Sequence, residues 1–479
     1  ALTVHAARTA AAACEVDTSD LSNVRVSVPA PFRITGFDRH KNRALRGGDA
    51  LRAVLRPPDG SRVGMGAVSR LGLPGIPPAL TLALVEQVRL QGLGRLALVG
   101  GAVRDALLHQ CYGASWTGLP DLDLVLEGSC ADLARGLQQR FGAERMPWLQ
   151  LHERFGTAEL MLDGVLIDLA GAREERYPLP GENPIVQPGP LEEDLARRDF
   201  TANAMALVLH GDGSQQLLDP HGGLDHLASR QLVFLHEASV SDDPTRVIRA
   251  ARYGARLGFD LDSGSLQQLK TTLERWPWAW RHGDVVDEVP PALGTRLRME
   301  LDLLLAREPW PQALTLLQKW SALPLLDPLL QSEAKLIRRL RRAARLQLPL
   351  LSALIAAAEE PVALAQRLEI PMQQLRWLEQ LQALRHWLEQ EVLPQPWRQW
   401  GALEWTSRLE QANWSAPVVA LAVIETPLCW RPMLRWWGRW RHATASVSAR
   451  DLIAQGMQPG PLLGEALRRS RDQVLEGLR

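Results

Sequence analysis

The chain has 479 residues, of which 46% are apolar, and its 54 basic groups balance its 54 acidic groups. This is the composition of a globular protein with more than one domain, since a single core seldom exceeds roughly 250 to 300 residues. The longest apolar runs, residues 353–358 and 417–424, are far shorter than the ~18 to 20 residues that cross a bilayer, so the composition excludes a membrane-spanning protein.

The cysteines and the basic residues narrow the class further. The four cysteines are scattered and never in CxxC spacing, which excludes a disulfide framework and a zinc site and favours a reducing cytoplasm. Only four of the 54 basic residues are lysines, so the other 50 are arginines. Guanidinium groups suit phosphate recognition, although codon usage alone also produces such a bias. Fifteen of the 17 tryptophans lie beyond residue 270, and we expect most of them in the core of a helical body.

Residues 1–64 mix Ala, Arg, Pro and Gly without a sustained period and carry ten basic and six acidic groups. We interpret this segment as an unplaced, disordered extension, either over-extended or linker-like. A transit segment is one alternative, but the early acidic residues Glu15, Asp17 and Asp20 argue against it. An insert that becomes ordered on RNA is another.

Periodic patterns begin at Pro77 and change in kind near residue 240. They predict in turn a helix around residues 80–88, a strand at 96–99 ending in Gly100-Gly101, a helix at 102–110, and strands at 122–126, 157–162 and 165–169, the last two joined by a turn at Asp163-Gly164. Helical periods follow, such as residues 246–257 and 297–306. The sequence therefore predicts a mixed α/β domain followed by a helical array.

Two features in the first half point to phosphate chemistry. Asp121 and Asp123 lie at i and i+2 around a strand, so both carboxylates face the same side and can bind Mg²⁺ ions. The Gly100-Gly101 turn lets the backbone approach a phosphate at a helix N-terminus. Each feature alone has an ordinary alternative, an exposed strand edge and a plain strand-to-helix turn. Their succession favours a phosphate cradle beside a metal site.

Four segments, 100–105 with 121–123, 197–206, 219–223 and 242–253, together resemble the motifs of the class II tRNA CCA-adding enzymes and bacterial poly(A) polymerases. The resemblance covers residues 93–256 and resumes near Arg296 and at the C-terminus. It implies an α+β protein with a polymerase-β-like nucleotidyltransferase head at 65–205, a helical neck at 206–280, and an all-α body and tail at 281–479 that bind tRNA.

The resemblance also implies an activity: addition of CMP, AMP or both from CTP and ATP to the 3′ end of tRNA, with Mg²⁺ as cofactor. The implied catalytic carboxylates are Asp121 and Asp123, which hold the metal, and Asp168, for which a strand-end cap is the alternative. The implied nucleotide-binding residues are Gly100, Gly101 and Arg104 at the triphosphate, Arg198 and Asp199 at the ribose, Asp243 and Arg246 at the base edge, and Asn203 and Arg249. Asp242 takes the place of a glutamate in the family's motif.

Several alternatives remain open within this resemblance. They are a partial enzyme that adds only A or only CC, a poly(A) polymerase, and a non-catalytic RNA-binding relative. The segment after residue 450 resembles the tail of many CCA-adding enzymes, which simple poly(A) polymerases generally lack, and this resemblance favours tRNA as the acceptor. The basic run that contains Arg338, Arg339, Arg342 and Arg345 is predicted to contact RNA phosphates, with a solvated helix face as the alternative. We predict no protein partner.

Overall fold

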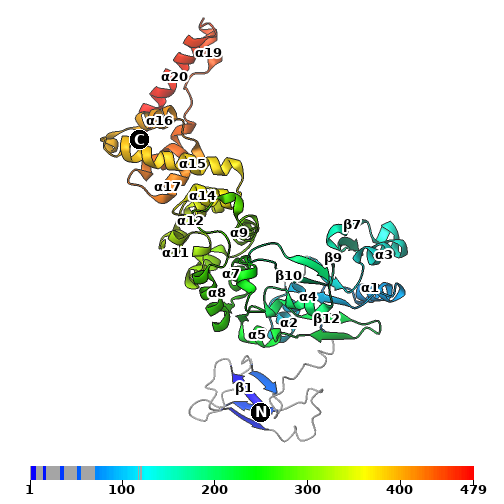
Figure 1. Ribbon diagram of the computed structural model, residues 1–479. Helices are drawn as coiled ribbons and strands as arrows, with labels where there is room; N and C mark the ends of the chain where they lie inside the picture. The colour runs from blue at the N-terminus through cyan, green and yellow to red at the C-terminus, as the bar shows by residue number, and fades with distance from the viewer. Residues whose placement is uncertain are drawn as a thin grey trace. The chain divides into compact units, whose positions relative to one another are not determined.

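The computed structural model describes residues 2–6, 14–17, 33–36, 51–55, 71–116, 118 and 121–478 (Figure 1). The chain forms two compact units: Ala1–Glu175 with Val186–Ser229, and Arg176–Ile185 with Arg230–Arg479. Within the predicted extension, four strands are described: β1 (Leu2–Ala6), β2 (Cys14–Asp17), β3 (Arg33–Gly36) and β4 (Leu51–Leu55), with β1 paired to β4 and β2 to β3. The predictions of disorder and of ordering on RNA lie outside the described residues.

A seven-stranded mixed sheet forms the centre of the first unit. In spatial order its strands are β13 (Gln215–Leu218), β12 (Ala206–Leu209), β5 (Leu96–Val99), β6 (Leu122–Leu126), β9 (Val165–Gly171), β8 (Thr157–Leu162) and β7 (Trp148–His152). β6 and β9 are parallel, and the other neighbouring pairs are antiparallel. All four residues of β5 are buried, which fits a strand covered on both faces.

The described part of the first unit contains the α-helices α1 (Pro78–Leu90), α2 (Gly101–Tyr112), α3 (Cys130–Arg145), α4 (Leu191–Ala196) and α5 (Gly223–Ser229). α3 packs on the strands β7, β8 and β9, α1 packs on α3, and α2 packs on β5 and β6. Leu107 of α2 and Leu133 of α3 are fully buried in these contacts. The helices thereby hold β5, β6 and β9 in place, and these strands carry the candidate site. A separate two-stranded ladder consists of β10 (Arg173–Arg176) and β11 (Ile185–Pro188).

The second unit is largely helical, as the sequence predicts. Its helices run along the chain (Figure 1) as α6 (Ser239–Asp242), α7 (Thr245–Leu257), α8 (Ser263–Arg275), α9 (Thr295–Arg307), α10 (Trp310–Lys319), α11 (Pro328–Ser332), α12 (Leu336–Arg345), α13 (Leu350–Ile355), α14 (Pro361–Arg367), α15 (Met372–Trp387), α16 (Ala402–Gln411), α17 (Ala416–Glu425), α18 (Trp430–Gly438), α19 (Ala449–Ala454) and α20 (Pro461–Glu476). Two-residue strands β14 (Gln231–Leu232) and β15 (Asp260–Leu261) pair in parallel. Many tryptophans are buried here, including Trp278, Trp320 and Trp405. In the described part of the chain, no helix has both the length and the apolar character that a membrane span needs.

Most predicted elements are confirmed, with small changes of boundary: α1, β5, α2, β6, β8, β9, α7 and α9. The turn between β8 and β9 has positive φ at both Asp163 and Gly164, the conformation that a two-residue hairpin loop requires. α3 is absent from the prediction because Gly136 and Gly142 interrupt its apolar pattern, and Gly142 is a kink with φ 68°.

The head extends beyond the boundary predicted at residue 205. Residues 206–218, predicted as the start of a helical neck, form β12 and β13, and β12 pairs directly with β5. The four residues of β12 are all buried and apolar. Such a short apolar run has no period that separates a strand from a buried helix segment, which explains the difference.

Helix α9 offers a test of the packing in the second unit. Leu301 is fully buried, whereas Met299 on the same helix is 57% exposed. We expect Leu301→Ala to lower the free energy of unfolding by about 2–5 kcal/mol, because it removes buried methyl groups and leaves a cavity. Met299→Ala is the matched control and should change stability by no more than about 0.5 kcal/mol. Thermal and urea unfolding, followed by circular dichroism, measure the stability of both variants. Equal losses of stability in Leu301→Ala and Met299→Ala would contradict this packing.

Candidate active site

Three carboxylates gather on one face of the seven-stranded sheet. Asp121 directly precedes β6, Asp123 lies within β6, and Asp168 lies on the neighbouring strand β9. Parallel pairing sets Asp123 opposite Asp168, and the alternation along a strand puts Asp121 on the same side as Asp123. Ligand oxygens of the three residues all lie within 4.8 Å of one another. The structure thus brings together the two predicted metal ligands and the third predicted carboxylate.

Burial and mutual repulsion disfavour the charged forms of this cluster. Burial, and then the charges of Asp121 and Asp168, raise the pKa of Asp123 to about 6, while the nearby Arg198 acts in the opposite direction. Burial is also the main cause of the raised pKa of Asp168, with repulsion from Asp121 and Glu159 added. Three hard oxygen ligands that repel one another suit a divalent cation, whose charge removes the repulsion. The residues present therefore fit a metal site.

A glycine turn joins β5 to α2 beside this cluster. Gly100 has φ 65° and ψ −133°, a conformation that residues with a side chain rarely adopt. A Cβ added at Gly100 would lie 3.2 Å from Nη1 of Arg198, so the turn also leaves room for that guanidinium. α2 begins at Gly101, where its first N–H groups favour an anion. Both predicted glycines therefore lie where a phosphate could approach the backbone.

Arg104 is engaged within the protein. It is 2% exposed; its Nη1 donates to Oδ1 of Asn203 (2.7 Å), and its Nε donates to Asp105 (2.8 Å). Asn203 in turn donates from Nδ2 to Oδ1 of Asp199 (2.9 Å), which also accepts from the N–H of Phe200 (2.8 Å). Arg104 thus links the first motif to the second. Its contact with a triphosphate stays a prediction.

Asp194 positions Arg198 and is absent from the predicted site. Asp194 is fully buried; its Oδ2 accepts from Nη2 of Arg198 (2.9 Å), and its Oδ1 accepts from Nη2 of Arg197 (2.7 Å). Asp194 precedes Arg197 by three residues and Arg198 by four. Side chains at these spacings share a helix face, so the sequence contains a local signal for this ion-pair cluster. The ion pair holds Arg198 near Gly100 and Asp123.

The predicted base-reading pair lies in the second unit. Asp243 is 7% exposed and Arg246 is 4% exposed. Oδ1 of Asp243 accepts from the N–H (3.1 Å) and Oγ1 (2.6 Å) of Thr245, and Oδ2 pairs with Arg296 of α9. Nη1 of Arg246 donates to the carbonyl of Ser239 (3.2 Å) and to Nε2 of His236 (3.2 Å). Asp243 therefore serves the start of α7 as well as offering a carboxylate, and His236 is a further residue that the sequence analysis does not contain.

Arg249 lies one turn after Arg246 on α7. Its Nη1 donates to Oε1 of Glu300 on α9 (3.0 Å), and its side chain is 32% exposed. Arg252 pairs with the same glutamate, so Glu300 joins α7 to α9. Nucleotide binding by Arg249 stays a prediction.

The predicted RNA-binding arginines of α12 separate into two groups. Arg338 and Arg345 are exposed, and so is Arg341, which shares their helix face. Arg339 pairs with Glu425 and donates to the carbonyl of Ala356 (2.8 Å), and Arg342 donates to the carbonyl of Ile424 (3.3 Å). The exposed group is thus the one accessible to phosphates, whereas Arg339 and Arg342 hold the ends of neighbouring helices.

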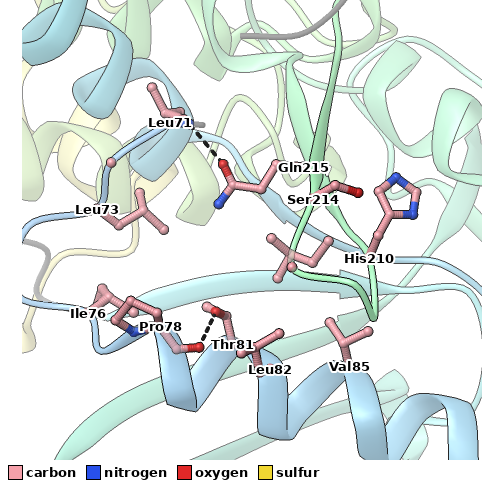
Figure 2. Close-up of a pocket in the computed structure, with 13 residues that line it drawn as sticks. Leu71, Leu73, Ile76, Pro78, Thr81, Leu82, Val85, His210, Ser214 and Gln215 are labelled. Atoms are coloured by element: carbon pink, nitrogen blue, oxygen red, sulfur yellow. Dashed lines mark hydrogen bonds between the residues drawn. The ribbon is translucent and has the colours of Figure 1, made fainter. Parts of the chain in front are cut away.

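A cavity of about 140 Å³ in the first unit lies apart from these residues (Figure 2). It is lined mainly by apolar side chains such as Leu73, Ile76 and Val85, with His210 and Ser214 at its edge, and the Leu71 N–H donates to Gln215 beside it (2.8 Å). No predicted site residue lines this cavity.

The chain is similar to known proteins over both units. Residues 96–233 match the family model of the poly A polymerase head domain. A CC-adding tRNA nucleotidyltransferase of Deinococcus radiodurans is 40% identical over 277 residues, which are 57% of this chain and 67% of that protein. An A-adding tRNA nucleotidyltransferase of Aquifex aeolicus is 35% identical over 246 residues, which are 51% of this chain and 27% of that protein.

The fold is similar to that of a solved structure as well. A CCA-adding enzyme in an apo form superimposes with a TM-score of 0.62 at 22% identity, over 83% of this chain and 92% of that one. This likeness supports a polymerase-β-like head followed by a helical region.

The carboxylate cluster predicts an unusual effect of one substitution on stability. Because the pKa of Asp123 is raised to about 6 in the folded protein, its ionised form destabilises the metal-free fold above pH 6, and this cost declines as the pH falls and the folded protein takes up the proton. We expect Asp123→Asn to raise the midpoint of thermal unfolding in EDTA at pH 7.5. The gain should shrink at pH 5, where Asp123 is already protonated.

Glu144→Gln is the control for this measurement, because Glu144 is an exposed carboxylate on α3 of the same unit. It should unfold like the wild type at both pH values. An Asp123→Asn protein that unfolds at or below the wild-type temperature in EDTA at pH 7.5 would contradict the electrostatic account.

Proposed function

Because this chain belongs to the class II tRNA nucleotidyltransferases, a family of enzymes, we propose that it transfers CMP, AMP or both from CTP and ATP to the 3′ hydroxyl of tRNA. The observation that carries the proposal is the cluster of Asp121, Asp123 and Asp168 beside the Gly100 turn. In the reaction, the 3′ oxygen forms a bond to the α-phosphorus of the nucleotide. The bond from this phosphorus to the bridging oxygen breaks, and pyrophosphate leaves.

Mg²⁺ is the proposed cofactor, and the three aspartates would hold it through carboxylate oxygens. When bound, it would neutralise the triphosphate and lower the pKa of the attacking hydroxyl. Residues of the first unit are proposed to bind the rest of the nucleotide. The turn at Gly100 and Gly101 presents backbone N–H groups to the phosphates, while Arg198, held by Asp194, and Asp199 contact the ribose.

Recognition of the base is assigned to Asp243 and Arg246. A carboxylate accepts from an exocyclic amine, which both cytosine and adenine carry, and a guanidinium donates to ring nitrogen and carbonyl acceptors. Asp243 lies in extended conformation two residues before α7 begins, and Arg246 lies in the first turn of that helix. Both are almost fully buried, so a base that pairs with them would do so with little competition from water.

CMP addition is the first candidate for the product. It is supported by the Deinococcus radiodurans relative, which matches 277 residues at 40% identity and is CC-adding. The Aquifex aeolicus relative supports A addition as the second candidate, over 246 residues at 35% identity. The head-domain match leaves poly(A) synthesis as a third.

The remaining proposals concern the acceptor and the location. The exposed face of α12 that carries Arg338, Arg341 and Arg345 is proposed to contact tRNA phosphates. Cys111, Cys130 and Cys429 are free thiols, which are typical of a reducing compartment, so we place the enzyme in the cytoplasm.

Nucleotide addition to three tRNA transcripts tests which product the enzyme makes. One ends before CCA, one ends in C and one ends in CC, and each is incubated with Mg²⁺ and labelled CTP, ATP or both. We expect one or two C residues on the first two transcripts. Addition of A only, and only to the CC-ended transcript, would establish an A-adding enzyme. Stepwise addition of C, C and A would establish a complete CCA-adding enzyme, and a long run of added A residues would establish a poly(A) polymerase. No incorporation by folded protein would contradict the proposed function.

Asp121→Asn tests the catalytic cluster. Loss of one metal ligand removes several kcal/mol of transition-state stabilisation, so kcat/KM for nucleotide addition should fall about 1000-fold or more. EDTA should abolish the wild-type reaction, and added Mg²⁺ should restore it. Glu144→Gln again serves as the control and should retain wild-type activity. Full activity of Asp121→Asn would show that the carboxylate cluster is not the reaction centre.

A further inference from the structure

We propose that His236 is a positioning residue that holds the guanidinium of Arg246 in place and thereby contributes to the choice of base. This inference rests on the proposed function, since it assumes that Arg246 reads the nucleotide. His236 does not belong to the predicted site and is ten residues from Arg246 in the chain.

The contact is partly buried and joins the buried guanidinium of Arg246 to the imidazole of the more exposed His236. Nη1 of Arg246 donates to Nε2 of His236 over 3.2 Å. A ring nitrogen accepts only when it carries no proton, so the histidine must be neutral with its proton on Nδ1. Burial, and then the charge of Arg246, lower the pKa of His236 to about 4. With Nε2 unprotonated, the imidazole accepts a hydrogen bond from Arg246.

The turn that carries His236 is fixed from two sides. The N–H of His236 donates to Oγ of Ser239 (3.2 Å), and the N–H of Ser239 donates back to the carbonyl of His236 (3.1 Å). Nε2 of Gln268 on α8 donates to the same carbonyl (2.9 Å). Ser239, which is fully buried, also accepts from Nη1 of Arg246 through its own carbonyl. The imidazole and this carbonyl thus form a rigid pair of acceptors for one guanidinium nitrogen.

A long arginine side chain needs such anchors to recognise one base edge. Free rotation of its side chain carries about 2 kcal/mol of conformational entropy, and an unanchored guanidinium could meet several base edges. Asp243, the other reader, has separate anchors in Thr245 and Arg296. Each of the two reading groups is therefore held independently, and loss of His236 should loosen Arg246 alone.

Open space beside His236 makes the inference testable. The residue lines a cavity of about 690 Å³ together with side chains such as Ser241, Gln268 and Thr272. Glutamine and alanine can replace the histidine without overpacking. Glutamine retains an acceptor in Oε1, whereas alanine and phenylalanine have none.

The experiment compares His236→Ala, His236→Phe and His236→Gln with the wild type. We measure kcat and KM for CTP and ATP, and the incorporation of UTP and GTP, on the tRNA transcript that the wild type extends. A hydrogen bond to a charged group contributes about 1.5–3 kcal/mol, so alanine and phenylalanine should raise the KM of the cognate nucleotide roughly 10- to 100-fold. They should also raise the incorporation of wrong bases, with a smaller change in kcat, and glutamine should restore part of the loss.

The matched control is His282→Gln. His282 is also a histidine of the second unit whose pKa is lowered mainly by desolvation, but its Nε2 lies 3.0 Å from the carbonyl of Pro324 rather than beside Arg246. The His282→Gln substitution should leave base discrimination unchanged. Folded alanine and phenylalanine variants with wild-type KM and discrimination would overturn the inference. A role in folding alone would lower the unfolding temperature without changing discrimination, and would overturn it too.

Equilibrium binding of labelled CTP and ATP to the same variants separates this inference from the proposed function. If the wild type transfers no nucleotide, the proposed function fails. Binding still decides the role of His236 in that case: weaker binding to His236→Ala with recovery in His236→Gln supports it, and equal binding overturns it.

Discussion

The parallel pairing of β6 and β9 places like charges side by side, and the site follows from this arrangement. It sets Asp123 opposite Asp168, and Asp121 adds a third carboxylate on the same face. An isolated helix or loop would move apart to relieve such repulsion. Here the strands lie in the middle of a seven-stranded sheet packed against α2 and α3, so the repulsion remains as a raised pKa of Asp123. The rigidity of the sheet is therefore what keeps a divalent-cation site in place before the cation arrives.

A layer of buried polar groups positions the residues that are proposed to contact the substrate. Arg198 is held by the fully buried Asp194, and Asp199 is linked through Asn203 to Arg104. Breaking such a buried pair leaves a charge without a partner, which costs about 3–5 kcal/mol. These residues are consequently constrained by stability as well as by chemistry. Their chemistry also depends on geometry, since a guanidinium discriminates only where its direction is fixed.

The sequence predicts the strands and helices that have a clear period, together with every carboxylate of the cluster. It does so because β5, β6, β8 and β9 have short apolar runs bounded by turn residues, and because Asp121 and Asp123 are close in the chain. Contacts between distant residues leave no such local signal. The hydrogen bond from Arg104 to Asn203 spans 99 positions, and it links two motifs in a way that neither motif indicates by itself. In the same way, a run of arginines on α12 does not reveal that Arg339 faces Glu425 while Arg338 is exposed.

If Asp243 and Arg246 read the base as proposed, specificity for one base must come from the surroundings of this pair rather than from its chemistry. A carboxylate and a guanidinium offer acceptors and donors that suit cytosine and adenine alike, and this chain resembles both CC-adding and A-adding relatives. The two bases differ in size and in the position of their exocyclic amine. Small displacements of Asp243 or Arg246 would therefore decide between them. The groups behind the pair, Arg296 for the carboxylate and His236 with Ser239 for the guanidinium, hold these side chains, so under the proposed function the choice of nucleotide depends on contacts behind the pair as well.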